Sequence, residues 1–164
     1  MASGRTHDII NLLALPPLVY YLKPSDYIGF STGYLIGTFF LSPDNDIYHS
    51  LPNKRWKFLK VLWKPYTKLF SHRGISHLPV VGVLSKLLYL FFIFFVIVLS
   101  VYILLGYFYP EGKKAVSKIA IDYSYLTSPF FVSFLVGLFL SEIIHILTDI
   151  VYSLFKKLFP KRIL

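Results

Sequence analysis

Four long apolar stretches alternate with polar segments along the chain, and this pattern predicts its architecture. The stretches cover residues 9–22, 27–43, 78–108 and 129–152. The interior of the third stretch, from residue 87 to residue 105, reads LLYLFFIFFVIVLSVYILL and contains no charged side chain. About 20 apolar residues are enough for an α-helix to cross a hydrocarbon core about 30 Å thick. We therefore predict an all-α polytopic membrane protein, in which residues 1–164 form a single membrane-embedded domain with a bundle of about four transmembrane helices.

The first two stretches are less regular than the other two. The first is short for a membrane span and contains Pro16 and Pro17, so it either spans with a kink, as we expect, or lies in the membrane interface. In the second stretch, Gly29, Gly33 and Gly37 recur every four residues. This spacing is typical of a small-residue face at which helix backbones approach closely, although glycine is also commoner in membrane helices in general.

Composition agrees with a membrane protein and limits the chemistry available. The 164 residues are 55% hydrophobic and 19% aromatic, and only 15% are charged, which is far more apolar than an ordinary soluble domain. Cysteine is absent, so disulfides and thiolate ligands are excluded, and any metal must be held by nitrogen and oxygen. Arg5 is the single basic residue ahead of the first stretch, and no small-x-small cleavage site follows near Leu22, so we expect this stretch to be retained.

The distribution of positive charge predicts how the helices are oriented. With four spans, both termini and the loop of residues 44–77 share one side, which holds twelve lysines and arginines, whereas the other side holds four. Lys86 lies inside the third stretch and is not counted. Because positive residues are enriched in cytoplasmic loops, we expect a multi-pass inner (plasma) membrane protein with both termini in the cytoplasm. Membrane lipids are then the partners that the formal charge of +9 indicates, and no nucleic acid is expected.

The residues that could carry chemistry gather at the cytoplasmic ends of these predicted helices. Histidines and aspartates precede the first span, close the second, open the third and close the fourth. Four helices packed in a bundle would bring these ends together around one pocket. We predict that this pocket binds a divalent metal through the following ligands: His7, Asp44, His72, His77, His145 and Asp149.

The last stretch gives this prediction a helical geometry. His145 and Asp149 are four residues apart and Glu142 is three residues earlier, so all three share one face of a helix. An acid at membrane depth is costly unless it meets a cation, a partner or water, so this face must point inward. The alternative is a hydrogen bond between helices for Glu142 and an interfacial position for the other two.

The segment His-Arg-Gly-Ile-Ser-His places two imidazoles around a glycine. If the chain turns at Gly74 and a helix begins near Ser76, both His72 and His77 can reach one centre. Arg73 between them would offer a planar fork suited to a phosphate group. The alternative is a positively charged membrane anchor with incidental histidines.

A pair of carboxylates, Asp44 and Asp46, directly follows Pro43 at the end of the second stretch. The segment departs from an EF-hand because its sixth position is His49 instead of glycine and its twelfth is Arg55 instead of glutamate. Asn and Asp after proline are also common simply as turn residues. The pair is a ligand candidate because histidines lie at the same ends of the other predicted helices. His49 lies several residues beyond the helix end, so it is not one of the predicted ligands.

Four motifs, taken together and in their order along the chain, resemble the family of membrane-bound metal-dependent hydrolases and the related uncharacterised metal-binding membrane proteins. The motifs are His7-Asp8, Pro43-Asp44-x-Asp46, His72-Arg-Gly-x-Ser-His77 and His145-x-x-x-Asp149. Many members of that family read Thr-His-Ser where this chain has Ser76-His77-Leu78, so the trailing hydroxyl is missing here. The resemblance implies a fold similar to the all-helical zinc-dependent phospholipase C and single-strand nucleases, with two or three zinc ions and phosphoester hydrolysis.

The residues are compatible with that activity. A histidine and carboxylate site suits zinc or manganese, and a bound cation lowers the pKa of its water to about 7. In this hypothesis Arg73 steadies the phosphate of a lipid or isoprenoid-like substrate, and Glu142 or Asp46 orients the attacking water. A metal-binding protein without catalysis, such as a sensor or a transporter accessory, needs the same ligands and is the second hypothesis. A purely structural membrane protein is the third hypothesis.

The aromatic and basic segment 51–70 suits an interfacial helix that acts as an anchor or a lid.

Overall fold

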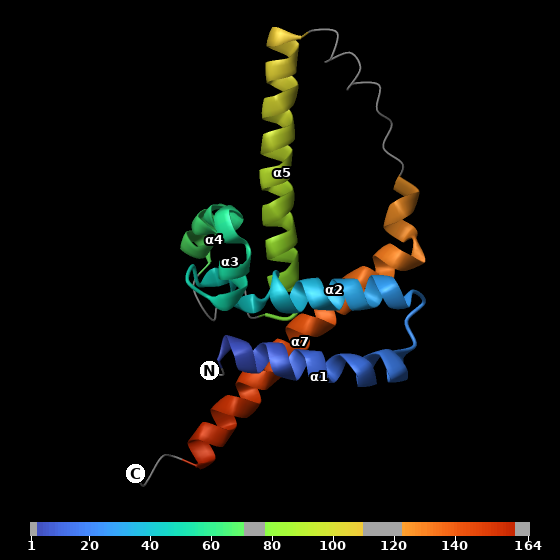
Figure 1. Ribbon diagram of the computed structural model, residues 1–164, viewed down its shortest axis with the longest axis vertical. Helices are drawn as coiled ribbons and strands as arrows, with labels where there is room; N and C mark the ends of the chain where they lie inside the picture. The colour runs from blue at the N-terminus through green and yellow to red at the C-terminus, as the bar shows by residue number, and fades with distance from the viewer. Residues whose placement is uncertain (1–2, 71–77, 110–122, 160–164) are drawn as a thin grey trace.

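All regular elements in the described part of the chain are helices, which confirms the all-α prediction. The computed structural model describes residues 3–70, 78–109 and 123–159. The elements are α1 (Gly4–Leu22), α2 (Tyr27–Phe39), the 3-10 helix η1 (Pro43–Asp46), α3 (Leu51–Arg55), the 3-10 helix η2 (Lys57–Leu62), α4 (Trp63–Leu69), α5 (Val81–Phe108), the 3-10 helix η4 (Tyr123–Thr127) and α7 (Pro129–Leu158). Figure 1 shows α1 and α2 lying across α7, with α5 projecting away from them.

Side-chain caps set where the three packed helices begin. Ser3 accepts a hydrogen bond from the Thr6 amide at 3.2 Å, and this cap starts α1 five residues ahead of the predicted stretch. Asp26 accepts from the Gly29 amide at 2.6 Å and Ser128 from the Phe131 amide at 3.2 Å. Such caps satisfy backbone donors that have no partner inside a helix. α1 continues through its two prolines, and α7 runs to residue 158, beyond the predicted end at residue 152.

Helices α2 and α7 pack backbone to backbone along a row of glycines. A Cβ atom at Gly33 would lie 2.0 Å from the carbonyl oxygen of Phe134, and one at Gly137 would lie 2.1 Å from that of Phe30. Gly29 meets the Phe130 carbonyl oxygen in the same way, whereas the atom nearest to a Cβ at Gly37 would be the Ser141 hydroxyl of α7. The two helices therefore cross with their chains running in the same general direction, and the glycine spacing marks a small-residue packing face.

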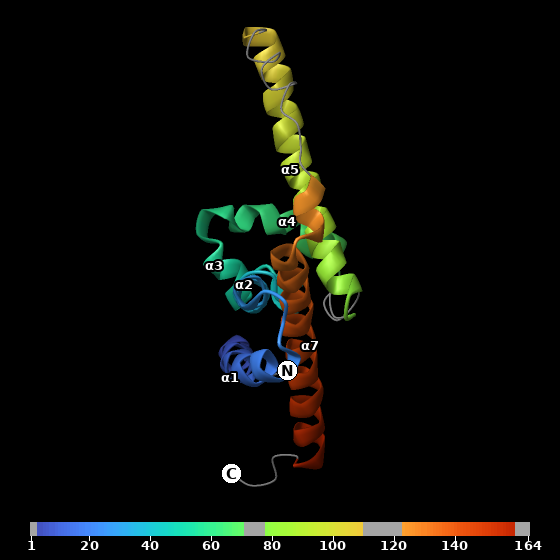
Figure 2. The ribbon, with the colours of Figure 1, turned by 90° about the vertical axis from the view of Figure 1, so that its right-hand side faces the viewer.

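Helix α1 lies beside α2 on the same side of α7 (Figure 2). The Tyr34 hydroxyl of α2 donates a hydrogen bond to the backbone oxygen of Asn11 in α1 at 3.1 Å. At the start of α1, Asp8 forms a two-point ion pair with the guanidinium of Arg55, whose Nη1 is 3.2 Å from Asp8 Oδ1. Arg55 also donates to the backbone oxygen of Phe39, so this one side chain joins α1, the end of α2 and α3.

Between α2 and α5, the described residues 43–69 fold as short helices, and the last of these packs against the base of α5. Trp63 and Tyr66 of α4 are buried in a small core with Leu41, Val83 and Leu138. The Tyr66 hydroxyl is 2.9 Å from Ser85 Oγ, and burial raises the pKa of Tyr66 to about 12. The predicted 44–77 loop is therefore helical over much of its described length, which includes the 51–70 segment.

Two described helices, α5 and α7, are long and apolar enough to cross a membrane. No residue in the most apolar part of α5 is buried, and most of its large side chains are exposed, a pattern typical of a helix surrounded by lipid. The four-span bundle is not confirmed. With 13 residues, α2 is about 20 Å long at 1.5 Å per residue, which is shorter than a hydrocarbon core. The predicted first span forms α1, which lies across α7 (Figure 1).

Candidate metal centre

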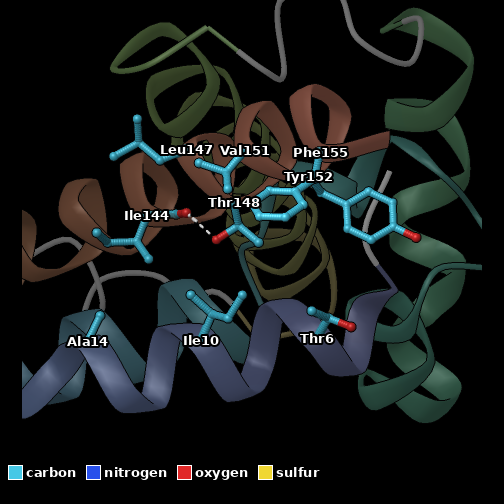
Figure 3. A pocket seen from close by; sticks show the side chains of 9 residues that line it. All are labelled: Thr6, Ile10, Ala14, Ile144, Leu147, Thr148, Val151, Tyr152 and Phe155. Carbon is cyan, nitrogen blue, oxygen red and sulfur yellow. Dashed lines mark hydrogen bonds between the residues drawn. The ribbon is translucent and has the colours of Figure 1, made fainter. Parts of the chain in front are cut away.

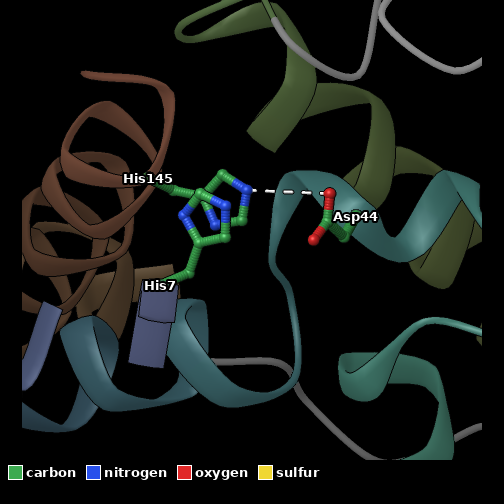
Figure 4. A group of neighbouring side chains, drawn as sticks. All are labelled: His7, Asp44 and His145. Atoms are coloured by element: carbon green, nitrogen blue, oxygen red, sulfur yellow. Dashed lines mark ion pairs between the residues drawn. The ribbon is translucent and has the colours of Figure 1, made fainter. Parts of the chain in front are cut away.

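Three predicted ligands from three separate elements meet in the described part of the chain. His7 comes from α1, Asp44 from η1 and His145 from α7 (Figure 4). One potential ligand atom from each residue lies within 4.8 Å of the other two. The exposed fractions of the three residues are 3%, 8% and 2%, so the group is almost fully removed from solvent.

The two imidazole rings of this group lie face to face. The ring centroids of His7 and His145 are 3.7 Å apart, and the ring planes differ by 9°. His145 Nε2 is 3.7 Å from Asp44 Oδ1, and His7 Nε2 is 3.3 Å from Asp149 Oδ1. Each histidine therefore has a carboxylate near its Nε2 atom, and Asp149 joins the edge of the group.

Local hydrogen bonds hold the three elements in place. Pro43 and the Ser42 hydroxyl begin η1, and Ser42 Oγ is also 3.3 Å from Nδ1 of His145. Behind η1, Asn45 donates to the Asn53 side chain at 2.7 Å, which ties η1 to α3. The Asp8 to Arg55 ion pair fixes the first turn of α1, from which His7 extends.

The charge state of His7 suits metal binding. Burial, followed by the neighbouring His145 ring, lowers the pKa of His7 below its ordinary value, and this effect outweighs the opposing attraction of Asp149 and Asp44. A neutral imidazole is the form that binds a metal. Among the described residues, Nδ1 of His7 has no hydrogen-bond partner, which is unusual for a buried polar atom. Two imidazoles and a carboxylate form a donor set that fits zinc or manganese.

The remaining predicted site residues have different positions. Glu142 forms a buried ion pair with Lys86, whose Nζ is 2.7 Å from Glu142 Oε2. Asp46 is buried in η1, two residues beyond Asp44. His72, Arg73 and His77 lie outside the described residues.

The position of the group along α7 differs from the prediction. The apolar pattern places His145 and Asp149 at the end of the last span, but α7 continues to Leu158 and holds them in its second half. The group forms there because α1 crosses α7 at this point and η1 follows from α2 (Figure 1).

Sequence reasoning missed two residues at this centre. Lys86 lies inside an apolar stretch, where a lysine requires a partner, and that partner is Glu142. Ser42 lacks any pattern that would single it out, because its role depends on the turn that leads into η1.

The contact between Ser42 and His145 leads to a prediction. Ser42→Ala is expected to weaken metal binding about 10- to 100-fold, as is typical when a group that orients a ligand is lost. Chelator competition on the purified protein measures this change. Ser100→Ala is the matched control, since Ser100 is exposed on α5 and bonds only to Val96 of its own helix among the described residues. Equal affinities for the two variants would contradict the role of Ser42.

An apolar groove of about 380 Å³ lies between α1 and α7 (Figure 3). Thr6, Ile144 and Thr148 on its walls directly neighbour His7, His145 and Asp149 in the sequence. Hydrocarbon side chains dominate the lining, which consists of Thr6, Ile10, Ala14, Ile144, Leu147, Thr148, Val151, Tyr152 and Phe155.

Comparisons with known proteins agree with a metal-binding chain. An uncharacterized protein of Aquifex aeolicus (strain VF5) is 46% identical over 140 residues, which cover 83% of this chain and 99% of the relative. No solved structure matches. Residues 2–159 match the family model described as "Uncharacterized metal-binding protein (DUF2227)", whereas the hydrolase part of the sequence resemblance stays a prediction. The chain therefore belongs to this family of uncharacterized metal-binding proteins.

Proposed function

We propose that this protein is a membrane-bound metal-dependent hydrolase that cleaves a phosphoester bond in a lipid or isoprenoid-like substrate at the cytoplasmic interface. The observation that carries the proposal is the buried group of His7, Asp44 and His145, whose ligand atoms lie within 4.8 Å of one another. Mixed nitrogen and oxygen donors of this kind are typical of metal sites in hydrolases.

The side chains have distinct roles in this proposal. His7, Asp44 and His145 hold a zinc or manganese ion, with Asp149, His72 and His77 as the further predicted ligands. A bound divalent ion supplies Lewis-acid chemistry, since it polarises a phosphoryl oxygen and lowers the pKa of water to about 7. Glu142, which pairs with Lys86, and Asp46, which is buried two residues beyond Asp44, are the two acids predicted to orient the attacking water. Arg73 remains the candidate for binding the phosphate.

Two features support a membrane location. The exposed apolar surface of α5 would be covered by lipid. The segment from α3 to α4 contains no acidic residue and exposes lysines beside large apolar side chains, which suits an anionic membrane surface and favours the anchor interpretation. Its exposed residues include Lys54, Lys57, Phe58, Leu59, Val61, Lys64, Lys68 and Leu69.

The groove between α1 and α7 supports a substrate with a hydrocarbon chain. Its volume of about 380 Å³ falls within the range of about 300 to 1,000 Å³ that is usual for ligand sites. Its walls include direct neighbours of the proposed ligands, so a chain lying there would bring its headgroup close to the candidate centre.

Activity of the metal-loaded protein tests the proposal. Detergent-purified protein loaded with zinc or manganese is expected to hydrolyse bis(p-nitrophenyl) phosphate or long-chain lipid phosphates, and chelation should abolish the activity. Asp44→Asn is expected to lower the rate about 100-fold, because the ligand loses its negative charge, whereas His49→Ala, at an exposed histidine, should match the parent. A fully loaded parent that hydrolyses none of these phosphoesters would refute the hydrolase proposal.

The low exposure of the three donors favours a second candidate, a metal-binding protein without catalysis. Structural metal sites are closed, whereas catalytic sites keep a position open to water or substrate. This candidate predicts one tightly held ion that exchanges slowly with free metal, together with no hydrolysis. Fast exchange combined with hydrolysis would exclude it.

A further inference from the structure

A buried ion pair joins α5 to α7 beside the candidate metal centre. The Nζ atom of Lys86 is 2.7 Å from Oε2 of Glu142, and the two side chains are 1% and 2% exposed. Removing two charges from water is costly, so a pair this deeply buried needs further compensation from its surroundings.

Additional negative charge comes from η1. Burial opposes the charge of Lys86, whereas the carboxylate of Glu142, followed by those of Asp46 and Asp44, favours the ammonium form. Three acids from two elements therefore act on one lysine, which α5 brings to the centre. Glu142 is also three residues before His145 on the same face of α7, so the ion pair adjoins the group of proposed metal ligands.

We propose that the Lys86 ammonium group occupies a cation position among Asp44, Asp46 and Glu142, so that the centre holds one divalent ion in place of two. This inference rests on the proposed metal-binding function and specifies the number of ions. It differs from the resemblance to zinc phospholipases, which implies two or three ions.

The chemistry of the groups supports this assignment. An ammonium group is a compact positive charge with three N–H donors, and it neutralises carboxylates much as a small cation does. Carboxylate oxygens are the ligands that hard ions such as Mn²⁺ and Mg²⁺ prefer. When the lysine charge is removed, the acids beside it repel one another, and binding of a divalent ion relieves that repulsion.

A simpler role for Lys86, as a tie between α5 and α7, makes a different prediction. If Lys86 only links the two helices, its loss lowers the stability of the protein and leaves the number of bound ions unchanged. The acids beside it would then be protonated or hydrated. The metal content of a Lys86 variant therefore separates the two roles.

The experiment compares manganese content in detergent-purified protein that has been loaded with MnCl₂ and freed of excess ion. The parent is expected to hold about one Mn²⁺ per chain and Lys86→Met about two, since the vacated position suits a hard ion. A Lys86→Met/Glu142→Gln variant lacks one of the acids and should return to about one ion. Thermal unfolding checks that each protein is folded, and if Lys86→Met does not fold, Lys86→Gln is measured by the same criteria.

The outcomes distinguish this inference from the function on which it rests. A parent with one ion and a Lys86 variant with one ion would overturn the inference and leave the metal-binding function intact. A parent that already holds two ions would also overturn it. A parent that binds no metal would refute both.

Discussion

His145→Ala is expected to abolish tight metal binding. The substitution removes one of the three donors brought together in the described centre, and at 2% exposure little water can replace the imidazole. The affinity for zinc should fall at least about 100-fold, which exceeds the 10- to 100-fold loss typical of residues that only orient ligands. Elemental analysis and chelator competition measure the change.

His49→Ala provides a matched control for this loss. His49 belongs to the same segment as Asp44 but is exposed, and its ring contacts the neighbouring Tyr48 edge-on. This variant should retain the metal content of the parent. Equal affinities for the His145 and His49 variants would show that the group of His7, Asp44 and His145 does not hold the metal.

Gly33→Ala is expected to separate α2 from α7 and to cause the largest loss of stability. Its Cβ would lie 2.0 Å from the carbonyl oxygen of Phe134, so the backbones of two packed helices must move apart. Overpacking of this kind costs about 1 to 3 kcal/mol and occasionally more. Because α2 leads into η1 and α7 carries His145, the metal affinity should fall together with the unfolding temperature.

Gly4→Ala tests whether this effect is specific to the α2 and α7 interface. The atom nearest to its Cβ would be Cβ of the Leu51 side chain, at 3.1 Å, where a small adjustment is enough. We expect an unfolding temperature close to that of the parent. If Gly33→Ala is as stable as Gly4→Ala, the close packing of α2 against α7 is incorrect.

The apolar pattern predicted the helices better than their arrangement. It placed α5 and α7 correctly because an apolar run of that length, uninterrupted by turn residues, strongly favours a helix. The first two stretches are not confirmed as spans, since hydropathy does not reveal that α2 ends at Phe39 or that α1 lies across α7. The glycine spacing of α2 did indicate its packing face, because only small residues permit such a close approach.

For the candidate centre, spacing within one helix was more informative than pairing between helices. The three- and four-residue intervals from Glu142 to His145 and Asp149 already place them on one face of α7. The partner of Glu142 depends on how α5 packs against α7, so Lys86 emerged only from the structure. The contact between Ser42 and His145 likewise spans distant parts of the sequence.

X-ray absorption at the zinc edge of the zinc-loaded parent tests the central claim most directly, because it reports which atoms surround the ion. We expect a coordination sphere of nitrogen and oxygen at about 2.0 to 2.2 Å, with scattering from at least two imidazoles, as His7 and His145 require. The imidazole signal should weaken in any residual zinc bound by His145→Ala. Failure of the parent to retain zinc, or a coordination sphere without imidazole, would contradict the proposed centre.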